Sequence, residues 1–124
     1  MQKRHFLHAV AAASLAVACG QAAAQTAGTF KIGLILPMSG PFASTGKQID
    51  AAVKLYLAQN GDKVAGKKVE VILKDDTGTP DVTKRLAQEL IVSDKVQVIA
   101  GFGLTPLAFT TAPLATQSKT PMVV

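Results

Sequence analysis

The sequence predicts an α/β protein built on a doubly wound parallel sheet. Short apolar runs of strand length alternate with longer segments whose apolar residues recur every three or four positions, and turns rich in glycine, proline and hydroxyl residues separate them. Such an alternation is typical of right-handed strand–helix–strand units with helices on both faces of the sheet. Strands are expected at 30–36, 68–74, 96–100 and 121–124, and helices at 47–60, 80–94 and 105–117.

The first strand is a nearly continuous apolar run that Pro37 ends. A loop at 38–46 follows, and its serine, threonine and glycine residues offer caps for a helix. From Lys47 onward the apolar residues fall on one helical face, and Asn60-Gly61 predicts a left-handed residue that ends this helix.

Apolar and charged residues alternate along 68–74, which indicates a strand near the sheet edge, although Ile72 interrupts the polar face. The following helix has a strong start signal. It combines a hydroxyl cap at Thr79, a proline at the first helical position, and Asp81 near the positive end of the helix dipole.

The third strand is short and apolar, and it runs into a tight glycine loop at 101–104. Thr105-Pro106 repeats the cap and proline signal and opens the third helix. The fourth strand reaches the last residue, Val124, so its outer neighbours in the sheet are not provided. We therefore expect this chain to be the N-terminal fragment of a longer protein.

Residues 1–24 have the three parts of a secretory signal peptide: basic residues at the start, an apolar stretch, and small residues before an expected cleavage after Ala24. The apolar stretch is shorter than the roughly 20 residues that a membrane-spanning helix needs. The alternative is a lipoprotein site with Cys19 lipidated, although Ala16 stands where such sites usually have a large aliphatic residue.

Composition excludes several classes of function. Without Lys3 and Arg4, 11 of the 13 basic residues remain against 8 acidic ones, a surplus too small and scattered for a nucleic-acid surface. His5, His8 and Cys19 all lie in the leader, so the expected mature chain has neither imidazole nor thiol. Serine or cysteine triads, disulfides and metal sites built on cysteine or histidine are therefore excluded there, and no cofactor is expected.

Ligands of such a sheet bind outside the carboxyl ends of the strands, where helix N-termini offer unpaired amides. Three loops reach this edge, at 37–46, 75–79 and 101–105. The third loop begins like a dinucleotide fingerprint, but Pro106 stands where the last glycine is needed and no acidic residue follows at the required distance. Its free amides, the Thr105 hydroxyl and the helix dipole still suit a carboxylate. A plainer interpretation, compatible with this one, is that Thr105 caps its own helix.

Asp75 leads to a second hypothesis. The run 75–79 directly follows a strand and resembles the aspartyl-phosphate motif of haloacid-dehalogenase-type phosphotransferases, in which the first aspartate attacks phosphorus. Such an enzyme also needs a lysine and a later acidic pair on neighbouring strands to hold magnesium, and the strand at 96–100 ends without a carboxylate. The simpler interpretation is a polar turn in which Thr79 caps the next helix.

The first loop carries hydroxyl groups and one aromatic residue, Phe42, but no charge. One interpretation is that it lines a cleft for a small polar ligand. The other is that it only caps the helix that follows.

These segments together resemble the Leu/Ile/Val-binding proteins of ABC transporters. The resemblance spans 30–124, and the residues that carry it are the run 31–41, Gly46, the Asp75-Asp76 turn, the glycine loop, 112–115 and 120–123. It implies a Rossmann-like lobe of a type I periplasmic binding protein, here incomplete. Residues 25–124 would form the N-terminal half of lobe one, after the signal peptide at 1–24.

The resemblance implies a non-enzymatic receptor that captures an amino acid or similar small carboxylate in the periplasm and delivers it to the membrane subunits of an ABC transporter. It places the ligand carboxylate at Thr105, next to Gly103 and Leu104, and a further contact in the first loop at about Thr45; Phe42 completes the candidate set. The family commonly has an aromatic residue at the place of Thr45, so the preference for branched-chain amino acids stays open. A sensory receptor domain of the same fold would require a membrane-spanning segment downstream.

Overall fold

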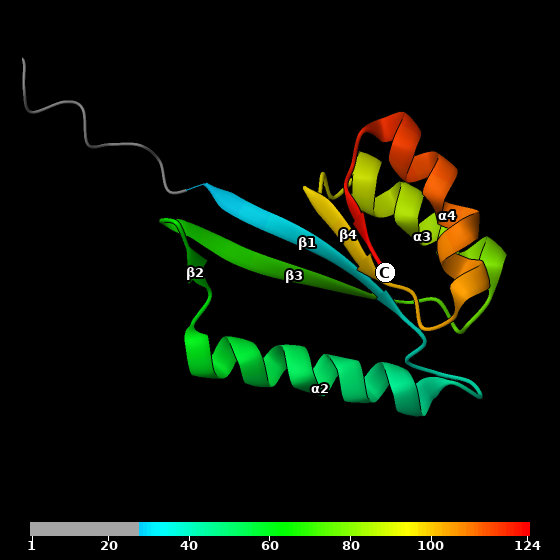
Figure 1. Cartoon of the computed structure of the whole chain (residues 1–124), viewed down its shortest axis with the longest axis horizontal. Helices are drawn as coiled ribbons and strands as arrows, with labels where there is room; N and C mark the ends of the chain where they lie inside the picture. The colour runs from blue at the N-terminus through cyan, green and yellow to red at the C-terminus, as the bar shows by residue number, and fades with distance from the viewer. Residues whose placement is uncertain (1–27) are drawn as a thin grey trace, which may run out of the picture.

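Residues 28–124 are described by a computed structural model, in which a five-stranded sheet has helices on both faces (Figure 1). The expected signal peptide, including Cys19, lies outside the described residues. The elements are β1 (Thr29–Leu36), α2 (Ala43–Asn60), β2 (Lys63–Val64), β3 (Lys67–Asp75), α3 (Pro80–Val92), β4 (Val98–Gly101), α4 (Thr105–Ser118) and β5 (Met122–Val123).

The strand order is β2-β3-β1-β4-β5, and all neighbouring strands are parallel except β2 and β3. The expected parallel sheet is confirmed for β3, β1, β4 and β5, and the antiparallel edge strand β2 was not predicted. β2 is a two-residue strand joined to β3 by Ala65-Gly66, both with positive φ, as in the tight turns that close hairpins. A strand of two residues is too short to show a periodicity. The expected position of β3 near the edge is confirmed.

The helix α2 begins at Ala43, four residues before the expected start at Lys47. The glycine at position 46 suggested a turn, but Gly46 lies buried inside the helix, where a side chain would collide with the carbonyl oxygen of Pro37. The end at Asn60 is confirmed. Gly61 has φ 79° and ψ 173°, so the expected left-handed helical cap is wrong.

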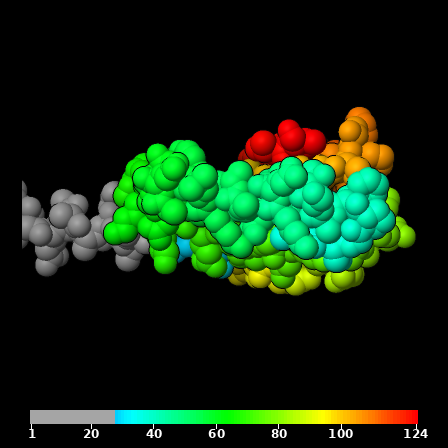
Figure 2. All heavy atoms as spheres, turned by 90° about the horizontal axis from the view of Figure 1, so that it is seen from below, coloured from blue at the N-terminus to red at the C-terminus, as the bar shows by residue number. Residues whose placement is uncertain are grey.

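The hydrophobic core lies between the sheet and the helix pair α3 and α4, while α2 covers the opposite face of the sheet (Figures 1 and 2). The core contains Ile35, Leu86, Ala87, Leu90, Val96, Ile99, Phe102, Leu107, Ala108 and Ala115. Ile72 packs against this core from β3, whereas its neighbours Val71 and Leu73 line cavities beside α2. Both faces of β3 are thus covered, which explains the apolar residue that interrupted its polar alternation.

The last two strands are shorter than expected. β4 begins at Val98, because Val96 belongs to the turn after α3, where it is buried in the core and its amide donates to the carbonyl oxygen of Leu90. β5 comprises only Met122 and Val123.

We predict that Gly46→Ala destabilises the protein. An alanine inside a helix normally stabilises by about 0.5–1 kcal/mol relative to glycine, but here the added methyl group meets the Pro37 carbonyl, and overpacking of this kind costs about 1–3 kcal/mol. Urea unfolding followed by circular dichroism measures the change. Gly28→Ala is the control, because nothing lies within 4 Å of the added carbon. A midpoint for Gly46→Ala at or above that of the control would contradict the predicted collision.

Candidate functional site

The three loops expected to form the ligand edge meet around the end of β1. Pro37 is buried there, between the first turn of α2 and the glycine loop after β4. A Cβ on Gly103 would lie 2.6 Å from Cδ of Pro37, and a side chain on Gly101 would collide with the carbonyl oxygen of Ile35. The close approach of these backbones is possible only because both positions are glycine.

One residue from each loop contributes to a small apolar surface at this edge. A Cβ built on Gly78 would lie 3.2 Å from Cδ2 of Phe42 and 3.9 Å from Cδ1 of Leu104. Phe42 is 43% exposed, so part of its ring remains available to a ligand. The structure therefore brings together two of the sequence-predicted residues, Phe42 and Leu104. Gly78 was missed because a glycine in a turn gives no sign of what packs on it.

The start of α4 presents amides without partners. Within residues 28–124, no hydrogen bond uses the amide of Gly103, Leu104 or Thr105, or the Thr105 hydroxyl. Thr105 is the first helical residue, and Leu104 precedes the helix without a side-chain cap, so the expectation that Thr105 caps α4 is wrong. Its hydroxyl and these three amides lie at the positive end of the helix dipole, an environment that favours an anion.

Thr45 does not lie in a loop as expected but in the first turn of α2. Its side chain is exposed, and its amide donates to the carbonyl oxygen of Phe42 at 3.1 Å. Thr45 is helical rather than in the loop because α2 begins four residues earlier than expected. No contact within the described residues joins its hydroxyl to the other two loops.

The turn after β3 is stabilised by Asp76 rather than by the expected Thr79 cap, since Thr79 makes no side-chain cap bond to α3. Asp76 is fully buried: its Oδ1 accepts from the Gly78 amide at 2.9 Å, and its Oδ2 accepts from the Thr83 hydroxyl at 2.9 Å. Thr77 and Gly78 both have positive φ, as in a type I′ turn. Because threonine rarely adopts this conformation, the turn depends on the contacts of Asp76.

Asp75 connects the first two loops. Its Oδ1 accepts from the amides of Met38 at 2.8 Å, Thr77 at 2.9 Å and Ser39 at 3.3 Å. Partial desolvation of the carboxyl raises its pKa, but hydrogen bonds from Ser39, Thr77 and Met38 outweigh this effect and hold the pKa below its ordinary value of 3.8. The carboxylate is therefore ionised at neutral pH and engaged with backbone amides.

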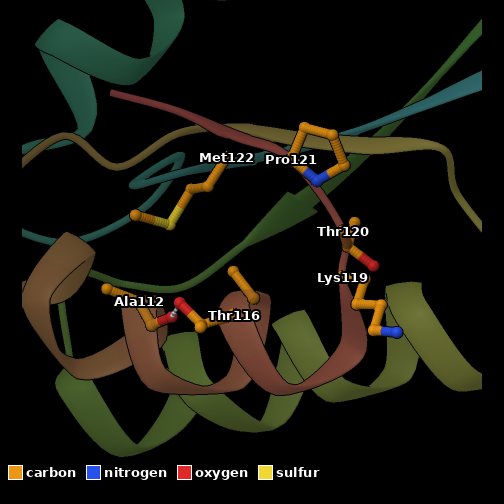
Figure 3. A pocket seen from close by; sticks show the side chains of 7 residues that line it. Ala112, Thr116, Lys119, Thr120, Pro121 and Met122 are labelled. Carbon is orange, nitrogen blue, oxygen red and sulfur yellow. Dashed lines mark hydrogen bonds between the residues drawn. The ribbon is translucent and has the colours of Figure 1, made fainter.

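Two cavities of the structure lie away from this edge. A groove of about 390 Å³ separates the C-terminal half of α4 from the start of β5, where Figure 3 shows the Met122 side chain extending toward Ala112. An apolar cavity of about 500 Å³ lies between α2 and the strands β1 and β3. Neither includes a residue of the predicted site, which the described residues leave as an open surface.

Two further findings concern residues 28–124. This part of the chain has no group of three or more histidine, cysteine, aspartate or glutamate residues that would hold a metal ion. None of its helices is both long and apolar enough to cross a membrane.

The family model of the periplasmic binding proteins matches residues 29–124. The chain belongs to the periplasmic binding protein family. Among curated relatives of this binding protein is Leu/Ile/Val-binding protein homolog 6 of Brucella abortus (strain 2308). It is 43% identical over 116 residues, which cover 93% of this chain and 30% of the relative. The chain therefore spans less than a third of that relative's length.

Two similar solved structures are solute-binding proteins of ABC transporters from Rhodopseudomonas palustris. The BisB5 protein, in complex with 3,4-dihydroxybenzoic acid, is 71% identical with a TM-score of 0.75, over 77% of this chain and 26% of that one. A second, in complex with 4-hydroxybenzoate, is 44% identical with a TM-score of 0.73 and the same coverage. These matches confirm the α/β fold class and the resemblance that the sequence indicated, and they give no support to a phosphotransferase.

We predict that Thr83→Val destabilises this binding protein by about 1–3 kcal/mol, because it leaves the buried Oδ2 of Asp76 without its donor. Thr111→Val is a matched control, since Thr111 is equally buried in a helix but its hydroxyl donates only to the carbonyl oxygen of Leu107. Thermal unfolding of the two variants gives the comparison. Equal losses of stability would show that the Asp76 contact contributes nothing of its own.

We predict that Asp75→Asn lowers stability at neutral pH and that the loss disappears in acid. A carboxyl whose folded pKa is below 3.8 stabilises the folded state above that pH and loses this contribution as the pH falls through the folded pKa. The free energy of unfolding is measured between pH 7 and pH 2.5. The control is Glu70→Gln, which removes an exposed charge with no ion pair or hydrogen bond within residues 28–124. A difference between wild type and Asp75→Asn that is constant with pH would contradict the lowered pKa.

Proposed function

We propose that the chain is part of the solute-binding component of an ABC transporter, which captures a small carboxylate in the periplasm for import. The observation that carries this proposal is the set of amides at Gly103, Leu104 and Thr105, together with the Thr105 hydroxyl, which have no hydrogen-bond partner within residues 28–124. Backbone amides at a helix N-terminus bind an anion without transforming it, as a transport receptor requires.

The ligand-binding residues in this proposal are Gly103, Leu104 and Thr105 for the carboxylate, and Phe42 and Thr45 for the rest of the molecule. Phe42 and Leu104 support an apolar contact because both lie against Gly78. Thr45 is exposed in the first turn of α2. Such a site combines an apolar surface with a few placed polar groups, as small-molecule sites generally do.

We infer that the ligand is an aromatic carboxylic acid. The solute-binding proteins solved with 3,4-dihydroxybenzoic acid and 4-hydroxybenzoate are 71% and 44% identical to this chain, and a benzoate complex is 31% identical. A benzoate has one carboxylate and a flat apolar ring, which matches the anion site beside Phe42 and Leu104.

The proposed assembly follows from this role. Export would use the signal peptide at 1–24, with lipidation at Cys19 as the alternative, and a second lobe would close over the ligand before the protein meets the membrane subunits of the transporter. Within the described residues, no observation favours a sensory receptor domain over this assignment.

We predict that the full-length protein binds 3,4-dihydroxybenzoate and 4-hydroxybenzoate more tightly than leucine in isothermal titration calorimetry. Thr105→Ala should weaken binding of these acids by about 1–3 kcal/mol, because it removes a hydrogen bond to a charged group. Thr116→Ala is the control on the same helix, since its hydroxyl donates to the carbonyl oxygen of Ala112 at the far groove (Figure 3). Unchanged affinity of Thr105→Ala would overturn the assignment of Thr105. Tighter binding of leucine would overturn the ligand class.

A further inference from the structure

One side chain holds together two loops that are far apart in the sequence. Asp75 ends β3, and its Oδ1 accepts from Met38 and Ser39, 37 and 36 residues earlier, as well as from Thr77 in its own turn. A single oxygen atom therefore accepts hydrogen bonds from both loops. The two loops cannot move independently while these three bonds are made.

The bonds lie directly behind the apolar part of the proposed site. Ser39 is three residues before Phe42, and Thr77 is adjacent to Gly78, on which the ring of Phe42 packs. The intervening Gly40 has a φ of 77°, and a Cβ there would lie 3.5 Å from the carbonyl oxygen of Thr77, so the backbones of the two loops are also in contact. The position of the Phe42 ring over Gly78 thus depends on the contact between the loops.

Asp75 itself is not placed to bind the ligand acid. A second carboxylate beside it would be repelled, and the oxygen that faces the loops is already occupied by three donors. Its contribution is therefore to the geometry of the unliganded site. If the loops are already ordered, less of the binding free energy is lost to ordering them when the ligand binds.

We propose that Asp75 is a positioning residue for ligand binding: it ties the loop of Met38 and Ser39 to the turn of Thr77, so that Phe42 is held in place before the ligand arrives. The inference rests on the proposed function. It also gives a role to the Asp75 motif, which in the sequence alone suggested a phosphoryl-transfer nucleophile.

The first test measures affinity in the full-length protein with 3,4-dihydroxybenzoate and 4-hydroxybenzoate as probes. Asp75→Ala should weaken binding of both acids about tenfold, because the loop must be ordered on binding. Asp75→Asn should recover most of the affinity, since its amide oxygen still accepts from the backbone. The control is Val96→Ala, which lowers the melting temperature by opening space in the core near the end of α3. Wild-type affinity in Asp75→Ala, or an equal loss in Val96→Ala, would overturn the proposal.

The second test separates this proposal from the proposed function. Hydrogen exchange of the unliganded protein should show faster exchange of the Met38, Ser39 and Thr77 amides in Asp75→Ala but not in Val96→Ala. This result does not depend on which ligand the protein binds, or on whether it binds the two acids at all. Equal exchange in wild type and Asp75→Ala would refute the positioning role even if both acids bind.

Discussion

The carboxyl edge of this sheet depends on the close packing of backbone against backbone at the end of β1. The segment from Ile35 to Pro37 lies between the first turn of α2 and the loop after β4, and side chains at Gly46 or Gly101 would collide with its carbonyl oxygens. Two connections of the fold are therefore fixed against one short piece of strand. The loop that leads into α4 packs against this segment, because a Cβ on Gly103 would lie 2.6 Å from Cδ of Pro37.

Two adjacent carboxylates organise the polar part of the same edge in different ways. Asp75 is exposed and accepts hydrogen bonds from the amides of two loops. Asp76 is fully buried and accepts hydrogen bonds from the Gly78 amide and the Thr83 hydroxyl. The amides that they accept are no longer available to a ligand. Within residues 28–124 the amides at the start of α4 have no acceptor, and under the proposed function they are the donors for the ligand carboxylate.

The sequence predicted the order and type of the main elements because apolar periodicity and proline signals are local properties. The prediction failed where contacts between distant segments determine the local structure. Gly46 suggested a turn but lies inside α2, where Pro37 leaves no room for a side chain. Thr79 and Thr105 were expected to cap their helices, yet neither hydroxyl does so. For the site, Phe42 and Leu104 were predicted, whereas the contact of Phe42 with Gly78 and the bonds of Asp75 join residues dozens of positions apart, which no local pattern reveals.

Backbone amides recognise a carboxylate but not the molecule that carries it. Under the proposed function, the discrimination between an aromatic acid and an aliphatic amino acid must therefore come from side chains such as Phe42 and Leu104, where the chain presents ring and methyl groups beside Gly78. Under the same proposal, the glycine loop and Thr105 would hold the carboxylate without specifying a branched-chain ligand. The hydrogen bonds of Asp75 and the packing of Pro37 hold the backbone of these loops, whereas Phe42 and Leu104 present the side chains that would distinguish one ligand shape from another.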